Sequence, residues 1–163
     1  MPIKMEVKTN KKAEKAINSL KDGYVKVGWF EGQKEPNGLP VAENAYMQNK
    51  GFTVTYKNGN SVYVPARPFM QITFDDNAVK WNEFWKRKYK DVANGKAKLK
   101  KLLDELGEIV RSDIRVTLRS NVQPKLREST LKARRSRGNY RTTTLIDSGT
   151  MYNSILFKSE VGK

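Results

Sequence analysis

The side chains that could do acid–base chemistry in this chain are carboxylates, because the sequence contains no histidine and no cysteine. Disulfides, thiolate metal sites and nucleophile–histidine pairs are therefore excluded. The densest acidic group, Asp104, Glu105 and Glu108, falls on a predicted helix rich in lysine, which favours a solvated ion-pair face over a metal cluster. No glycine-rich phosphate loop with its lysine occurs. We therefore expect a protein that is not an enzyme, with no catalytic residue, metal site or cofactor.

A different chemistry is offered by the arginine of the Val-Pro-Ala-Arg-Pro-Phe stretch, residues 64–69. Pro65 and Pro68 fix φ and keep the preceding residues out of the helical region, so Arg67 stands on a stiff backbone. Its guanidinium can then be aimed at a carboxylate or at backbone carbonyls with little loss of entropy. We expect such a pairing within the subunit or across an interface, and we expect Phe69 to pack between a hairpin and the long helix. The alternative is an ordinary strand-to-helix connection with a surface ion pair.

Positive charge dominates the chain, with 32 Lys+Arg against 17 Asp+Glu and a net charge of +15. This balance favours a polyanionic neighbour such as nucleic acid, an acidic protein ring or an anionic membrane. The excess peaks in residues 111–141, which have ten Lys+Arg and two acids. We predict that residues 123–144 form a flexible basic loop that a partner orders, because few apolar residues there offset the entropy of ordering. An acidic ring surface is preferred to DNA as that partner, since fixed arginines along a conduit would hold back the DNA passing through it.

The predicted helices and strands that would position these groups indicate a single α+β domain over residues 1–163. The prediction is a small antiparallel sheet with a β-hairpin, packed against one long and several shorter helices, with extended loops and a basic arm. Apolar residues make up only 37% of the chain, which indicates a thin or elongated body. No run of 18 apolar residues and no signal-peptide core occurs, so we expect no membrane contact and assembly in the cytoplasm. Helices are expected over residues 11–20, 41–50, from 75 or 76, over 96–119, near 129 and around 151, and strands over 24–30, 52–56, 61–64 and 154–158.

Aromatic residues alternate with lysines on the predicted helix that follows the proline corner. Trp81, Trp85 and Tyr89 are spaced at i, i+4 and i+8. Exposed rings of this kind would suit base stacking on a single strand. We favour instead a place in the core or at a subunit interface, because large aromatic side chains contribute most when buried.

Four stretches occur in a fixed order: Val-Ala-Glu-Asn-Ala-Tyr-Met-Gln-Asn-Lys-Gly at 41–51, the proline corner at 64–69, Leu-Arg-Glu-Ser-Thr at 126–130, and Leu-Ile-Asp-Ser-Gly-Thr-Met-Tyr-Asn-Ser-Ile at 145–155. Together they resemble the minor virion proteins of tailed bacteriophages, the family called tail completion, head–tail joining or virion morphogenesis protein. One departure is the Asn-Lys-Gly helix end, where family members often have Glu-Phe-Gly or Glu-Tyr-Gly.

The resemblance implies a structural virion protein that forms a homo-oligomeric ring, most often a hexamer, at the junction of the DNA-filled head and the tail. The implied partners are the adjoining head–tail connector and the tail tube or tail terminator proteins. The resemblance also allows contact with packaged DNA. The alternative hypothesis, on the charge alone, is a basic nucleic-acid-binding or DNA-packaging accessory protein. The residues expected to serve interface and assembly are Pro65, Arg67, Pro68, Phe69, Arg134, Arg135 and Arg137.

Overall fold

The computed structural model describes residues 23–161, so the helix expected over residues 11–20 lies outside the described part of the chain. The predicted α+β class with antiparallel strands is confirmed. In chain order the elements are β1 (Tyr24–Gly28), α2 (Val41–Lys50), β2 (Phe52–Thr55), β3 (Ser61–Val64), α3 (Phe69–Ala93), α4 (Leu99–Arg119), α5 (Glu128–Ser136), α6 (Thr150–Asn153) and β4 (Leu156–Glu160).

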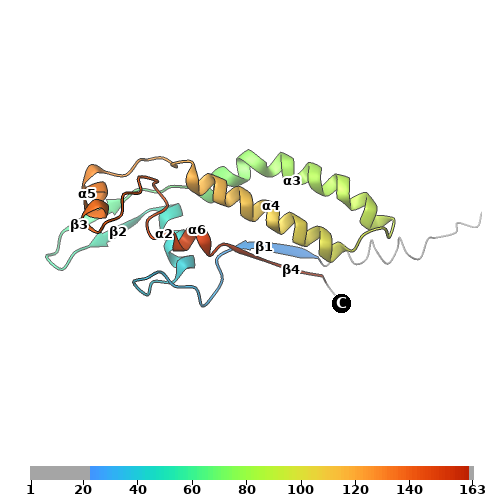
Figure 1. Cartoon of the computed structure of the whole chain (residues 1–163), viewed down its shortest axis with the longest axis horizontal. Helices are drawn as coiled ribbons and strands as arrows, with labels where there is room; N and C mark the ends of the chain where they lie inside the picture. The colour runs from blue at the N-terminus through green and yellow to red at the C-terminus, as the bar shows by residue number, and fades with distance from the viewer. Residues whose placement is uncertain (1–22, 162–163) are drawn as a thin grey trace, which may run out of the picture.

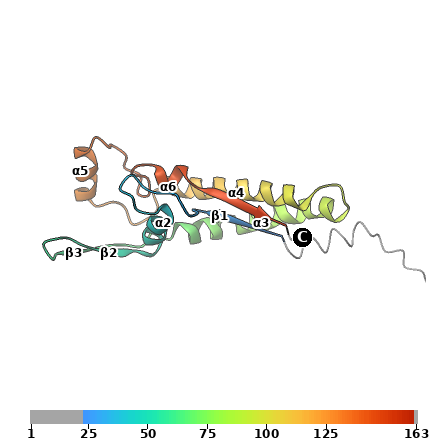
Figure 2. The same cartoon turned by 90° about the horizontal axis from the view of Figure 1, so that it is seen from below.

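An elongated body is formed by α3 and α4, which run side by side along the long axis (Figure 1). The strands β1 and β4 pair antiparallel and cover the side of α4 away from α3. The strands β2 and β3 form a second, separate two-stranded sheet rather than extending the first. Their hairpin projects from one end of the body, where α5 also lies (Figure 2). None of the described helices has the length and apolar character needed to cross a membrane.

The predicted apolar stripe on α4 is confirmed as the spine of the core. One cluster of buried residues joins Ile114 and Leu118 of α4 to α2, the start of α3, and α6. A second cluster, with Leu102 and Leu103, lies near the other end of α4. Gly107 lies between them, where an added Cβ would stand 2.5 Å from Cδ2 of Phe157, so glycine allows β4 to pack close to the helix.

The two long helices are tied together by polar side chains as well as by apolar packing. The hydroxyl of Thr73 on α3 donates to that of Thr117 on α4 at 2.8 Å, and both side chains are buried. The indole Nε1 of Trp81 donates to Asp113 Oδ2 at 2.7 Å. Trp85 packs against the second core cluster. Trp81 and Trp85 therefore stabilise the packing within the subunit, in agreement with the core location that was one of the two favoured from their spacing.

The start of α3 was predicted wrongly. We expected Asp75 or Asp76 to open this helix, but it begins at Phe69, directly after the proline corner, and is 25 residues long. The residue that precedes α3, Pro68, has no side chain that can cap the helix. Asn49 at the end of α2 supplies the cap, because its Oδ1 accepts a hydrogen bond from the Met70 N–H at 3.1 Å. The structure thus has two long helices, and the Asn-Lys-Gly end of α2 holds the beginning of the first one.

Local turn chemistry was predicted more successfully. The hairpin turns at Asn58-Gly59, and Gly59 has φ of 84°, the left-handed backbone that glycine adopts without strain. The helix α2 ends at Gly51, whose N–H donates to the Met47 carbonyl. The last strand is β4 over Leu156–Glu160, two residues later than expected, because α6 and its C-cap at Ser154 occupy the preceding residues.

Candidate functional site

A cleft of about 750 Å³ opens at the end of the molecule where the hairpin and α5 lie. One wall is the apolar hairpin face formed by Phe52, Val62 and Val64. The opposite wall is formed by the segment that leads into α5 and by the chain after it. Two nearly buried arginines, Arg67 and Arg134, line it as well. We call this feature the arginine cleft.

All four stretches that carry the family resemblance contribute to the arginine cleft, although they are far apart along the chain. The helix α2 and the proline corner line one part of it, and residues 126–130 and 145–151 line another. The contributing residues from these stretches are Asn44, Gln48, Val64, Pro65, Arg67, Leu126, Arg127, Thr130, Leu145, Asp147, Ser148, Gly149 and Met151. Tertiary folding therefore brings the motifs into one site.

The proline corner holds Arg67 as the sequence predicted, by a contact within the subunit. Its side chain is aimed at a carbonyl across the cleft, and Nε donates to the Pro124 oxygen at 2.9 Å. Its backbone N–H donates to the Gln48 carbonyl at 2.9 Å, which fixes the corner against α2. Arg67 is 4% exposed. Burial, and then the nearby Arg134 guanidinium, lower the pKa of Arg67 below its ordinary value, although arginine stays charged at neutral pH.

Phe69 is fully buried, but its neighbours differ in part from those expected. Its ring meets that of Trp29 edge-on, with centroids 5.8 Å apart. It belongs to the same core cluster as Ile114 and Leu118 of α4, and that cluster contains no hairpin residue. Phe69 therefore packs against α4 and Trp29 and not between the hairpin and α4. The apolar face of the hairpin lines the cleft instead.

Arg134 is the residue whose role the sequence did not reveal. It is 5% exposed, and its terminal nitrogens donate to four carbonyls, those of Arg141, Thr143, Thr144 and Ile146, at 3.1, 2.9, 3.4 and 3.2 Å. Its Nε lies 3.3 Å from Asp147 Oδ1 without forming a hydrogen bond. Burial lowers the pKa of Arg134, and Asp147 opposes that shift. One guanidinium thus organises the whole turn over residues 141–147.

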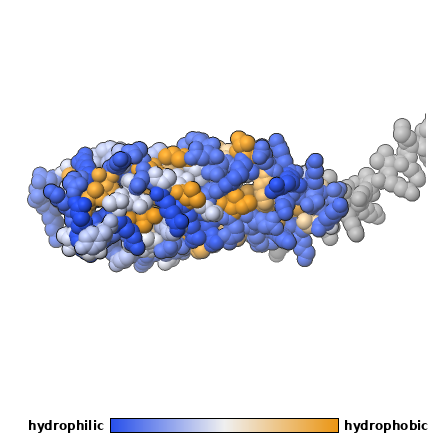
Figure 3. All heavy atoms as spheres, turned by 45° about the horizontal axis from the view of Figure 1, so that its top comes forward, coloured by the Kyte–Doolittle hydropathy of each residue, from blue (hydrophilic) through white to orange (hydrophobic). Residues whose placement is uncertain are grey.

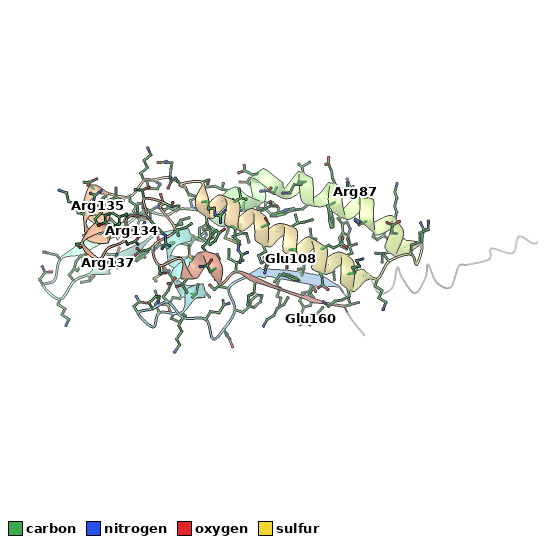
Figure 4. All side chains as sticks on the ribbon, viewed as in Figure 1. Arg87, Glu108, Arg134, Arg135, Arg137 and Glu160 are labelled. Carbon is green, nitrogen blue, oxygen red and sulfur yellow. The ribbon has the colours of Figure 1, made fainter. Side chains whose placement is uncertain are left out.

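The three arginines expected to act together are separated by the fold. Figure 4 shows Arg134, Arg135 and Arg137 at the α5 end of the molecule. Arg135 is exposed and pairs with Glu128, whereas Arg137 is exposed, lines the cleft and lies 3.3 Å from Asp147. Arg134 is therefore a buried structural residue rather than part of a mobile cationic surface. The flexibility of residues 123–144 in an isolated subunit stays a prediction, but in the folded chain this segment contains α5 and is anchored by Arg134.

The acidic side chains that line the cleft make contacts within the chain. Glu35 accepts hydrogen bonds from Asn44 and Ser148 at 2.8 and 2.9 Å, so its carboxylate joins α2 to the segment that precedes α6. The acids of α4 form ion pairs, with Asp104 2.5 Å from Lys100 and Glu105 3.7 Å from Lys88. Over residues 23–161 no group of three acidic side chains is arranged to hold a metal ion. The arrangement can attract and orient an anion.

No protein-family model, curated protein or solved structure matches this chain. The resemblance to phage virion proteins therefore rests on the four stretches of sequence alone.

Proposed function

We propose that this chain is a structural subunit of a tailed-phage virion, which forms a ring at the head–tail junction as a tail completion or neck protein. The observation that supports this function is the convergence of the four family-like stretches on one binding cleft. A catalytic protein would instead gather acids, nucleophiles and bases at such a place. The partners proposed are copies of the same chain, the head–tail connector, and the tail tube or tail terminator protein.

The shape of the subunit suits an assembly whose neighbours complete its order. The β2–β3 hairpin has only two strands and projects from the body, and two strands alone are marginally stable in water. Its exposed residues include Tyr63 at 58% and Val62 at 37%. Unpaired strand edges with apolar side chains are surfaces on which another subunit can dock. The face of the molecule seen in Figure 3 is mostly polar, with small apolar areas.

The proposal is tested by locating the protein in purified particles and by measuring its oligomeric state. We expect cryo-electron microscopy to place a ring of this subunit between head and tail, and light scattering to detect oligomers at high concentration. Tyr56→Lys, at a hairpin residue that is 55% exposed and does not line the arginine cleft, should prevent assembly without lowering the melting temperature. Val79→Lys, which also introduces a lysine at an exposed position but on α3, should leave assembly intact. A chain that stays monomeric and is absent from particles would refute the proposal.

A nucleic-acid-binding or packaging accessory protein is the second candidate function. It is favoured by the exposed cations of the α5 region, which are Lys125, Arg127, Lys132, Arg135, Arg137 and Arg141. Binding of this kind would be independent of sequence and would weaken steeply as salt rises, because each phosphate contact releases counterions. Tight, salt-sensitive binding to any duplex, together with absence from the virion, would favour this function over the first.

A further inference from the structure

The arginine cleft contains more hydrogen-bond donors than the described chain uses. A guanidinium has five N–H donors, and the one hydrogen bond that the Arg67 guanidinium makes within residues 23–161 is from Nε to the Pro124 carbonyl. Arg134 Nε makes no hydrogen bond in the same part of the chain, but it lies 3.3 Å from Asp147 Oδ1, so this guanidinium already has a counter-ion. Arg67 is 4% exposed and lines the cleft, which leaves its terminal nitrogens as the donors that a ligand there can use. A buried guanidinium with unused donors and a second guanidinium nearby is a group that an anion would stabilise.

The walls of the cleft indicate the kind of molecule that carries this anion. Phe52, Val62 and Val64 offer an apolar face on the hairpin side, and Leu126 faces from the other wall. A volume of about 750 Å³ is in the range of sites for small ligands and short peptide segments. It is far too small to admit a nucleic-acid duplex. Glu35 and Asp147 also line the cleft, but five lysine and arginine side chains of the lining outnumber them, so the cleft as a whole is cationic.

We propose that the arginine cleft binds an acidic, partly apolar segment of another protein, whose carboxylates contact Arg67 and Arg137 and whose apolar side chains lie on the hairpin face. Charge complementarity favours an acidic segment of a different protein over one from a second copy of this chain, which carries a net charge of +15. Bidentate contact between guanidinium and carboxylate supplies both affinity and orientation. This inference rests on the proposed function in one respect, namely that the segment belongs to an adjoining virion protein.

The first experiment uses the full chain as an isolated subunit and a blocked peptide of alternating valine and glutamate. We expect calorimetry to give a dissociation constant on the order of 100 µM or tighter. Amide NMR shifts should change for Val62, Val64 and Leu126. The matched peptide with glutamine in place of glutamate should bind about tenfold more weakly, because it loses the charge-assisted contacts.

Variants then test whether the arginines of the cleft are responsible. Arg137→Gln should weaken binding of the glutamate peptide severalfold, since Arg137 is exposed and its loss leaves the core intact. Arg87→Gln removes the same charge from α3 near the opposite end of the molecule and should leave binding unchanged (Figure 4). Arg67→Gln should abolish binding. Its folding is checked separately by circular dichroism, because this side chain also holds Pro124.

Several results would overturn the inference. These are equal binding of the glutamate and glutamine peptides, equal losses in Arg137→Gln and Arg87→Gln, or inorganic phosphate that competes as well as the peptide. A short DNA duplex that shifts the same cleft amides and displaces the peptide would assign the cleft to nucleic acid instead. Each of these outcomes is read on the isolated subunit, so it is independent of whether the protein is found at the phage neck.

Discussion

The role assigned to Arg134 predicts a large loss of stability from a single substitution on a charged, lysine- and arginine-rich helix. Arg134→Leu fills much of the same volume but removes donors from the carbonyls of residues 141, 143, 144 and 146. Arg135→Leu is the matched control. It removes the same charge one residue away, where the side chain is exposed and pairs only with Glu128 among the described residues.

The magnitude follows from the contacts. A hydrogen bond to a charged group contributes about 1.5–3 kcal/mol, and three of the four carbonyl contacts of Arg134 are 3.2 Å or shorter. Part of that sum is offset because the buried guanidinium no longer has to be desolvated and because water reaches some of the freed carbonyls. We expect a net loss of about 3–5 kcal/mol, the range for breaking a buried charged network by removing one partner. For Arg135→Leu the expected loss is about 1 kcal/mol or less.

The assay is urea unfolding followed by circular dichroism, combined with amide hydrogen exchange. Exchange at residues 141–147 should accelerate strongly in Arg134→Leu and stay near the wild-type rate in Arg135→Leu. Leu145 and Met151 belong to the main core cluster, so opening of this turn should also lower global stability. Arg134→Lys, which keeps the charge without the planar fork of donors, should lie between the two. Losses that agree within about 1 kcal/mol for Arg134→Leu and Arg135→Leu would refute a buried organising role.

The remaining predictions concern α4. Gly107→Ala places a Cβ 2.5 Å from the Phe157 ring and should destabilise the fold by about 1–3 kcal/mol in urea unfolding. The gain of about 1 kcal/mol in helix propensity offsets only part of this loss, and a matched Ser112→Ala on the exposed face should be close to neutral. If Phe157→Leu fails to rescue Gly107→Ala, the steric account is wrong. Hydrogen bonds from Lys100 and then Ser159 hold the pKa of Asp104 below its ordinary value, so its stabilising contribution is present above the unfolded pKa and is lost as pH falls through the lower folded pKa. Asp104→Asn should therefore be less stable than the wild type at neutral pH and equal to it below both pKa values, whereas a difference that does not change with pH would contradict this linkage.

Elements whose signals are local were predicted well. The turn at Asn58-Gly59 and the end of α2 at Gly51 depend on the backbone preferences of one or two residues. The stripe of α4 depends on a period of 3.6 residues, which is visible in the sequence. The start of α3 was missed because its capping oxygen belongs to Asn49, 21 residues before Met70, and no local pattern contains that information.

The features of the candidate site also fall into those that the sequence predicts and those that depend on the tertiary structure. The absence of histidine and cysteine excluded their catalytic and metal-binding chemistry, and the two prolines fixed the stiff corner that aims Arg67. The acceptor of Arg67 is 57 residues away, at Pro124, and Arg134 is buried only because the chain from residue 141 to 147 folds around it. By residue type and charge, Arg134, Arg135 and Arg137 are equivalent cations within one short segment. Only tertiary packing decides which of them loses water and binds carbonyls and which remains exposed, because desolvation and hydrogen bonding depend on segments that are distant in the sequence.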